Sequence, residues 1–272
     1  MVPAVPASPG RSRFARPVLI LVDMTNKTAL ITGANKGIGL ATARQLAAQG
    51  FVVFLGARDP KRGKQAEQDL RNDGHDARFV HLDVTNPDLI TATKAGIEQS
   101  HDHLDVLVNN AGITTRGGLP SQTDLDGVRE VMETNVLGVI AVTSAMLPLL
   151  RNAPSARIVM VSSEIGSVGF MSDPSSPAWP MPASISYPLS KTALNMVTAM
   201  FAKELATTGI KVNAANPGYC ATDLNAHAGF RSAAEGAEVS VHLATLPDDG
   251  PTGTFWGYRW GGGDPAYGPL PW

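Results

Sequence analysis

The sequence has one cysteine, few aromatic residues and almost no net charge. Cys220 is the only cysteine among 272 residues, which excludes an intrachain disulfide and a cysteine-based zinc cluster and suits a reducing cytoplasm. Twenty-two basic residues against 24 acidic ones give a formal charge of −2, so no overall field attracts nucleic acid or an anionic membrane. No unbroken apolar run approaches the roughly 20 residues that span a bilayer. The sequence therefore predicts a soluble, cytoplasmic protein with no nucleic-acid or membrane partner.

The two ends of the chain differ in composition from its middle. Residues 1–23 hold four prolines and three arginines with little that could pack, which predicts a disordered N-terminal extension. A secretory signal is the alternative, but the apolar stretch 17–22 is shorter than a signal core and has no small-residue cleavage site after it. The segment from Pro247 is rich in glycine and proline yet holds three of the four tryptophans, so we expect it to be irregular but packed. Residues 24–272 are expected to form a single domain.

Between these ends, short β-rich segments alternate with helix-like ones. The β-rich segments are 27–32, 51–57, 77–84, 104–110, 156–163 and 210–217. Strands that alternate with helices pair in parallel through right-handed crossovers. The predicted fold class is α/β, a Rossmann-type doubly wound parallel sheet with helices on both faces. Ligands of such sheets lie beyond the carboxyl ends of the strands, so the residues directly after each strand are the candidates for function.

A glycine-rich segment, TGANKGIG, follows the first predicted strand directly. Gly33 permits a tight turn, Gly37 lets the backbone approach a pyrophosphate, and Gly39 lets the helix start close to the sheet. Backbone N–H groups and the helix dipole then face an anion. An ordinary strand-to-helix turn would also use these glycines. Their position between a strand and a helix favours a dinucleotide site.

The end of the second predicted strand bears on the choice between NAD and NADP. An NAD site usually places a carboxylate there for the ribose 2′-hydroxyl, whereas a 2′-phosphate needs cations. Here the strand ends in Ala57 and Arg58, and Lys36 in the glycine loop could meet the same phosphate. Either cation could be a solvated surface residue, and Asp59 could neutralise Arg58. Two converging cations without an acid at Ala57 favour NADP(H).

The catalytic pattern is YPLSK, in which Tyr187 and Lys191 lie four residues apart on a predicted helix. Both side chains then leave the same face of the helix, one turn apart. An ammonium beside a phenol favours the phenolate, so we expect the pKa of Tyr187 to be lowered towards neutral pH, where the phenol can exchange a proton with an alcohol or carbonyl oxygen. Ser163, which closes the fifth predicted strand, would bind the same oxygen. The Tyr-x-x-x-Lys spacing alone also arises by chance.

These motifs, in this order, resemble the short-chain dehydrogenase/reductase family, whose glycine pattern is Thr-Gly-x-x-x-Gly-x-Gly. TGANKGIG and LGARDPKRG are also similar to the NADP-binding segments of its carbonyl reductase-like branch. The resemblance runs from about Thr25 to at least Asp223. It implies a catalytic tetrad in which Tyr187 is the acid/base, Ser163 orients the carbonyl, Lys191 holds ribose hydroxyls and assists the tyrosine, and Asn135 holds a water in a proton relay. The family's use of the second serine favours Ser163 over Ser162.

The resemblance also implies contacts to the cofactor along the chain. Asp83 after the third strand would contact adenine, the NNAG segment would line the cofactor, and NPGYCATD would supply contacts to the nicotinamide. Turn chemistry alone could explain the Asp, Asn and Gly residues at these positions. The expected cofactor-binding residues are Gly33, Asn35, Lys36, Gly37, Ile38, Gly39, Arg58, Asp83, Val84, Asn110, Ala111, Gly112, Tyr187, Lys191, Pro217, Gly218 and Thr222.

One segment departs from the family pattern. The 24 positions from Ser163 to Tyr187 exceed the family's common spacing, and the extra residues include 169–184. Both ends of this segment are tied to catalytic residues, so we expect it to border the active site, with Met171, Trp179 and Met181 forming a pocket wall for a moderately hydrophobic substrate. A packed surface flap at a subunit contact is the alternative.

Several other residues invite functional interpretations. His101 and His103 could share a metal, but no third ligand is evident, and we expect no metal site. Met196 and Met200, on the helix of Tyr187, have the spacing of a stripe that faces the core or a second subunit, so a homo-oligomer is possible. Cys220 could be reactive, but a small residue in the wall of the pocket is the simpler interpretation.

The sequence as a whole favours an NADPH-dependent oxidoreductase that reduces a ketone or aldehyde to an alcohol, reversibly, within an NADP-binding domain at 24–272. A sugar-nucleotide epimerase or dehydratase shares Tyr-x-x-x-Lys, but such enzymes are generally longer and have a differently spaced glycine loop. A catalytically silent NADP-sensing regulator is a third candidate, against which the complete tetrad argues.

Overall fold

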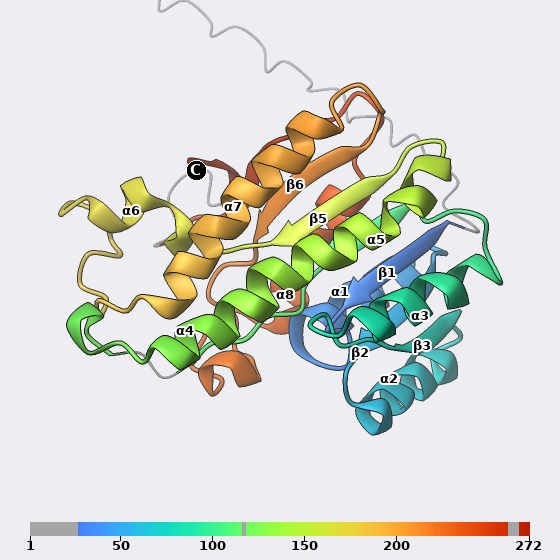
Figure 1. Cartoon of the computed structure of the whole chain (residues 1–272), viewed down its shortest axis with the longest axis horizontal. Coiled ribbons are helices and arrows are strands. Elements are labelled where there is room, and N and C mark those ends of the chain that lie inside the picture. Colours follow the sequence, from blue (N-terminus) through green and yellow to red (C-terminus); the bar gives the residue numbers. More distant parts are fainter. Residues whose placement is uncertain (1–26, 116–117, 261–266) are drawn as a thin grey trace, which may run out of the picture.

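The structure, a computed structural model, describes residues 27–115, 118–260 and 267–272. One sheet of eight strands has the order β3-β2-β1-β4-β5-β6-β7-β8 (Figure 1). Neighbouring strands from β3 to β7 pair in parallel, and β8 pairs antiparallel to β7. The strands are β1 (Thr28–Thr32), β2 (Val52–Ala57), β3 (Ala77–His81), β4 (Val106–Asn109), β5 (Arg157–Val161), β6 (Lys211–Asn216), β7 (Phe255–Tyr258) and β8 (Tyr267–Leu270). The expected disordered extension, residues 1–23, lies outside the described residues.

Helices separate the parallel strands. The α-helices are α1 (Gly37–Ala47), α2 (Pro60–Asn72), α3 (Pro87–Glu98), α4 (Leu125–Met132), α5 (Gly138–Asn152), α6 (Val168–Ser172), α7 (Ser186–Glu204) and α8 (Ala233–Ala244). Shorter turns of helix are η1 (Pro120–Gln122), η2 (Glu133–Leu137), η3 (Glu164–Gly166) and η4 (Asp223–Asn225). Several of the helices begin where the sequence provides a cap; Asp59, for example, accepts hydrogen bonds from the backbone N–H groups of Lys61 and Arg62.

The sheet is buried on both faces because successive apolar residues of each strand point to opposite sides. Leu30 of β1 packs into a core cluster with residues of α3, α5 and α7, whereas the next residue, Ile31, packs with residues of α1, α2 and α8. Figure 1 shows α3, α5 and α7 on the near side of the sheet. The two clusters together make a three-layer α/β/α arrangement. The predicted Rossmann-type doubly wound fold is confirmed, and all six predicted strands are present.

The C-terminal segment differs from the prediction. It was expected to be irregular but packed, and it instead supplies β7 and β8, which extend the sheet beyond β6. Gly257 explains how β7 can pair there, since a Cβ at this position would lie 2.1 Å from the carbonyl oxygen of Asn216 on β6. Trp256 and Tyr267 pack against the core cluster on the α8 side, and the ring of Trp272 stacks on Phe255 at 5.7 Å.

One stretch of helix is long and apolar enough to cross a membrane by length and composition alone, a test that a buried core helix also passes. Within the described part of the chain, Leu125–Asn152 has an 18-residue window with a mean hydropathy of 1.5, and 56% of that window is buried inside the structure. This stretch comprises α4, η2 and α5, and the buried side of α5, including Val142 and Met146, lies in the core. The stretch is not an unbroken apolar run, because charged residues such as Arg129, Glu130 and Glu133 interrupt it.

Met196 and Met200 lie on the surface of α7 and not in the core, with 62% and 50% of their area exposed. Leu189, about two turns nearer to the start of the helix than Met196, is also exposed. The spacing allowed a stripe that faces the core or a second subunit, and the prediction of a core-facing stripe is wrong. A subunit-facing stripe stays a prediction.

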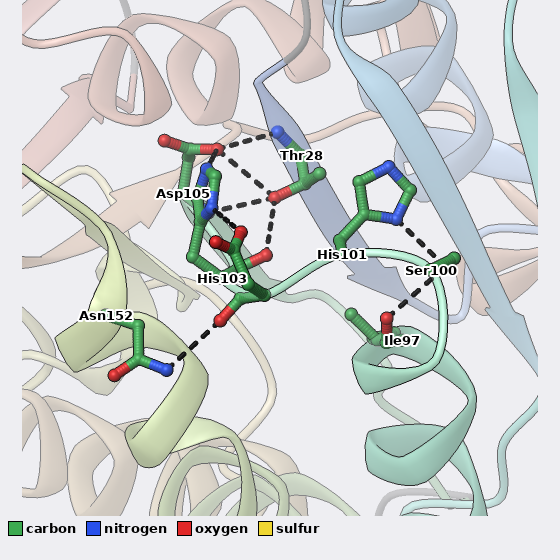
Figure 2. Close-up of polar contacts among 8 residues, drawn as sticks. Thr28, Ile97, Ser100, His101, His103, Asp105 and Asn152 are labelled. Atoms are coloured by element: carbon green, nitrogen blue, oxygen red, sulfur yellow. Dashed lines mark hydrogen bonds and ion pairs between the residues drawn. The ribbon is translucent and has the colours of Figure 1, made fainter.

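His101 and His103 have different polar partners at the amino-terminal end of β4. Figure 2 shows the His101 ring bonded to Ser100, with Nδ1 2.9 Å from the serine Oγ. The His103 ring lies between two carboxylates, with Nδ1 2.5 Å from Asp102 and Nε2 3.3 Å from Asp105. Asp105 also accepts a hydrogen bond from the backbone N–H of Thr28, which ties β4 to β1. Within the described residues, no group of three His, Cys, Asp or Glu is placed to hold a metal.

Candidate active site

A cavity of about 820 Å³ lies at the carboxyl ends of the parallel strands. Its walls are made by the residues that directly follow β1 to β6, as the fold class leads one to expect. All of the residues predicted to bind the cofactor line this one cavity, and so do Ser163, Tyr187 and Lys191 of the predicted tetrad. Asn135 does not line it. The volume is in the usual range for a small-molecule or cofactor site.

The glycine loop shapes one wall of the cavity. Gly33 and Gly37 have φ of 65° and 56°, which side chains other than glycine adopt at a cost. A Cβ on Gly39 would lie 2.5 Å from the carbonyl oxygen of Gly33, so only glycine lets α1 start this close to the strand end. Thr32 Oγ1 accepts hydrogen bonds from the N–H groups of Asn110 and Ala111, both at 2.9 Å. The ends of β1 and β4 are therefore held together beneath the loop.

Two cations line the end of the cavity near β1 and β2. Arg58 follows β2, and no ion pair within the described part of the chain involves its guanidinium. Asp59 does not neutralise it, because that carboxylate caps α2 and lies 3.4 Å from Arg62. Lys36 precedes α1, and its ammonium lies 2.6 Å from Asp223. The cation pair predicted from the sequence thus faces the cavity, with Lys36 already engaged.

Asp83 after β3 and Asn110 after β4 each make local hydrogen bonds in addition to lining the cavity. Asp83 Oδ1 accepts hydrogen bonds from the N–H and hydroxyl of Thr85, at 3.0 and 2.7 Å. The side-chain amide of Asn110 donates to the carbonyl oxygen of Thr32 at 2.8 Å. Turn chemistry and cavity lining are therefore combined in these two residues.

The two serines after β5 have different surroundings. The Ser162 hydroxyl is buried and bonds to Asn195 Oδ1 at 2.5 Å. Ser163 is partly exposed and lines the cavity together with Tyr187. The second serine is therefore the one whose hydroxyl is free of the core network.

Tyr187 and Lys191 lie in the first turns of α7, on the side that faces the cavity. Lys191 Nζ lies 5.3 Å from the centre of the Tyr187 ring and donates a hydrogen bond to the Val161 carbonyl at 2.7 Å. Burial lowers the pKa of Lys191 to about 8. Burial, and then the nearby Cys220, raise the pKa of Tyr187 above its ordinary value. The expected lowering of the Tyr187 pKa is therefore wrong for the chain alone, because burial, which favours the neutral phenol, is the largest influence on it.

Asn135 lies behind the cavity wall and is fully buried. Its Oδ1 accepts a hydrogen bond from the N–H of Ile113 at 2.8 Å, and its Nδ2 donates to the Ile113 carbonyl and to Ser190. It is the central residue of η2, a five-residue π-helical turn between α4 and α5. The structure thus places its side chain as a support for the strand-end loop and the base of α7. The expected role in a proton relay stays a prediction.

Several cavity residues were missed by the sequence reasoning. Tyr219, Phe230 and Trp260 come from three separate segments, and their ring centres lie 5.6–6.5 Å apart. Glu164 is buried next to Ser163 and accepts a hydrogen bond from the N–H of Trp260 at 2.7 Å; burial raises the pKa of its carboxyl group. The Arg231 guanidinium lies 3.7 Å from the ring centre of Tyr258. No short motif marks these residues, and only tertiary folding brings them together.

The expected pocket wall from residues 169–184 is only partly present. Met181 lines the cavity, but Met171 and Trp179 do not, and Trp179 is 54% exposed. The segment forms α6 and a series of turns that lie to the side of α7 (Figure 1). The aromatic residues after β6 and β7 instead supply the apolar wall. Phe230 of this wall lies in the segment between Thr222 and α8.

A doubly wound sheet whose glycine loop, strand-end serine and Tyr-x-x-x-Lys helix converge on one cavity defines a nicotinamide-dependent oxidoreductase. The family model described as short chain dehydrogenase matches residues 27–231. The chain belongs to the short-chain dehydrogenase/reductase family.

Individual relatives agree with this assignment. The chain is 37% identical over 233 residues to the short-chain dehydrogenase anuI of Penicillium roqueforti, covering 83% of this chain and 91% of the relative. Among solved structures it is similar to salutaridine reductase from Papaver somniferum, with a TM-score of 0.75 and 28% identity over 85% of this chain and 99% of that one. It is also similar to a gluconate 5-dehydrogenase from Burkholderia cenocepacia, which was solved in complex with NADP and tartrate. The TM-score is 0.76 and the sequence identity 25%, over 86% of this chain and 95% of that one.

Proposed function

We propose that the protein is an NADPH-dependent carbonyl reductase that converts a moderately hydrophobic ketone or aldehyde to the alcohol, reversibly, in the cytoplasm. The observation that carries this proposal is the convergence of Ser163, Tyr187 and Lys191 with the glycine loop and two cations on one cavity. The similarity to a reductase and to an NADP complex supports it. We further propose that the chain belongs to the carbonyl reductase-like branch of its family.

The cavity fits NADP(H) by its shape and its donors. The glycine loop is so close to the start of α1 that a Cβ on Gly39 would collide with the Gly33 carbonyl. In this tight loop the backbone N–H groups at the start of α1 would bind a pyrophosphate. Lys36 and Arg58 would hold the 2′-phosphate, and Asp83 would hold adenine at the same end of the sheet. Lys191 would bind ribose hydroxyls. Pro217, Gly218 and Thr222, after β6, would flank the nicotinamide.

The side chains support proton transfer in the reductive direction. A bound reduced nicotinamide supplies a hydride to the carbonyl carbon. The Tyr187 phenol is protonated at neutral pH, burial raises its pKa further, and it can donate its proton to the carbonyl oxygen. The Lys191 ammonium, 5.3 Å from the ring centre, stabilises the negative charge that develops on the phenol oxygen. Ser163 donates a hydrogen bond that orients the carbonyl.

The substrate end of the cavity is apolar. Tyr219, Phe230, Trp260 and Met181 line it, and Ile113 lies nearby in the same wall. Aromatic and thioether surfaces of this kind favour a bulky, largely uncharged carbonyl compound. The charged groups on this side include the carboxylate of Glu164 and the guanidinium groups of Arg231 and Arg259. Glu164 accepts a hydrogen bond from Trp260, Arg231 stacks on Tyr258, and Arg259 donates to the Pro269 carbonyl.

Turnover of NADPH with a panel of ketones and aldehydes tests the proposal. Tyr187→Phe should lower turnover about 10²–10⁴-fold while the NADPH dissociation constant stays unchanged, because one proton donor is lost and nothing else. Tyr258→Phe is the matched control, since its hydroxyl bonds to Glu238 outside the cavity. A wild-type protein that binds NADPH but oxidises it with no carbonyl would indicate the silent regulator, and reaction of a sugar nucleotide without net NADPH consumption would indicate the epimerase alternative.

A further inference from the structure

An ion pair spans the mouth of the cavity. The Lys36 ammonium lies 2.6 Å from Oδ2 of Asp223, a residue 187 positions further along the chain. Lys36 belongs to the glycine loop after β1, whereas Asp223 begins η4 after β6. Both side chains line the cavity and are about half exposed, at 51% and 53%. The pair therefore joins two cavity walls at the edge that meets solvent.

The carboxylate of Asp223 is held firmly in this position. Its Oδ1 lies 3.0 Å from His227 Nε2, so each oxygen has a partner. Ala226 and His227 have φ of 51° and 62°, and they are the non-glycine residues with positive φ in the described part of the chain. The side chains of Thr222 and Asn225 close a capping box around η4. The Asp223 carboxyl group is ionised at neutral pH, and Lys36 lowers its pKa further below the ordinary value.

A phosphate that approaches Lys36 meets this arrangement. A phosphate monoester carries about two negative charges at neutral pH, and a carboxylate within a few ångströms of it is repelled. An ammonium has three N–H donors, so Lys36 can meet the phosphate while it keeps its contact with Asp223, but the carboxylate then neutralises part of the positive charge that Lys36 offers to the phosphate. Arg58 has no such competitor, since no ion pair involves it within the described residues.

We propose that Asp223 competes with the 2′-phosphate of NADPH for Lys36 and so limits the preference of the enzyme for NADPH over NADH. This inference rests on the proposed function, because it takes NADPH as the ligand of the cavity. Asp223 acts through Lys36, without contact to the reacting atoms. Of the two cations, Lys36 is held in an ion pair with Asp223, and the 2′-phosphate must compete with this carboxylate for the Lys36 ammonium.

Asp223→Asn is the direct test, because it keeps the shape of the side chain and removes its charge. It should lower the NADPH dissociation constant by about three- to tenfold and leave the NADH constant unchanged. In a Lys36→Ala background the same substitution should have no effect on NADPH binding. Asp126→Asn is the matched control, since Asp126 makes an equally short pair with Arg129, at 2.6 Å, outside the cavity.

Calorimetric titration of the full chain with NADPH and with NADH measures these constants, and the melting temperature of each variant verifies folding. Weaker or unaltered NADPH binding in Asp223→Asn overturns the inference. Equal tightening in the Lys36→Ala background also overturns it, since the effect would then be direct repulsion. If the wild-type chain binds neither dinucleotide, the proposed function fails as well. If it binds NADPH normally and Asp223→Asn changes nothing, the inference alone fails.

Discussion

The buried Lys191 should make the stability of the cofactor-free protein depend on pH in a way that a Lys191→Met variant lacks. The side chain is 4% exposed and its ammonium bonds to a neutral carbonyl, and burial lowers its pKa from 10.5 to about 8. Below this pH the lysine is charged in both the folded and the unfolded chain, and the folded state bears a desolvation cost of about 3 kcal/mol. Above it, the folded lysine is neutral while the unfolded lysine keeps its proton, so the cost disappears.

The unfolding free energy of the wild type should therefore rise by about 2 kcal/mol relative to Lys191→Met between about pH 7 and about pH 9.5. Urea unfolding, followed by circular dichroism at both pH values, measures the difference between the two proteins, in which other titrating groups cancel. Lys203→Met is the control, because Lys203 is an exposed lysine on the same helix. A wild-type to Lys191→Met difference that is the same at both pH values would refute the reasoning.

Two further predictions concern the cavity walls. Ser163→Ala should lower carbonyl turnover by about 100-fold or more. Ser162→Ala should mainly lower the free energy of unfolding, by about 1 kcal/mol, because the Ser162 hydroxyl bonds to Asn195. Steady-state kinetics and urea unfolding measure both effects, and a larger loss of turnover in Ser162→Ala than in Ser163→Ala would contradict the assignment. Trp260→Ala should raise KM for bulky apolar ketones with an unchanged NADPH constant, while Trp179→Ala should not, and equal KM values across a size-graded ketone series in both variants would count against the assigned wall.

The six strands that the sequence predicted are those with apolar runs between turn-forming residues. β1, β2, β4, β5 and β6 are almost wholly buried, and apolar residues fill most of their buried positions. The last two strands, 255–258 and 267–270, are only four residues long and contain Gly257 and Pro269, which read as loop residues. Gly257 is needed because β7 passes so close to Asn216 that no side chain fits, and this close approach is a property of the folded sheet.

In the candidate site, too, the residues fixed by short sequence spacings were predicted, whereas those brought together only by folding were not. The glycine loop and the pair Tyr187–Lys191 are set by short sequence spacings, so the sequence placed them together on the cavity. The direction of the Tyr187 pKa depends on how much water the fold removes, which spacing does not encode. The apolar wall is built from segments around Tyr219, Phe230 and Trp260 that are distant in the sequence, and the sequence reasoning assigned that wall to residues 169–184 instead.

The state of Cys220 has a practical consequence for labelling. The thiol is 4% exposed, and burial raises its pKa to about 11, so roughly one molecule in ten thousand carries the reactive thiolate at neutral pH. Because the chain has no other cysteine, the unmodified protein is almost silent towards maleimides and other thiol probes. A cysteine introduced at any exposed position, such as Ala228 beside the cavity mouth, therefore becomes a single fluorophore attachment point without prior removal of native thiols.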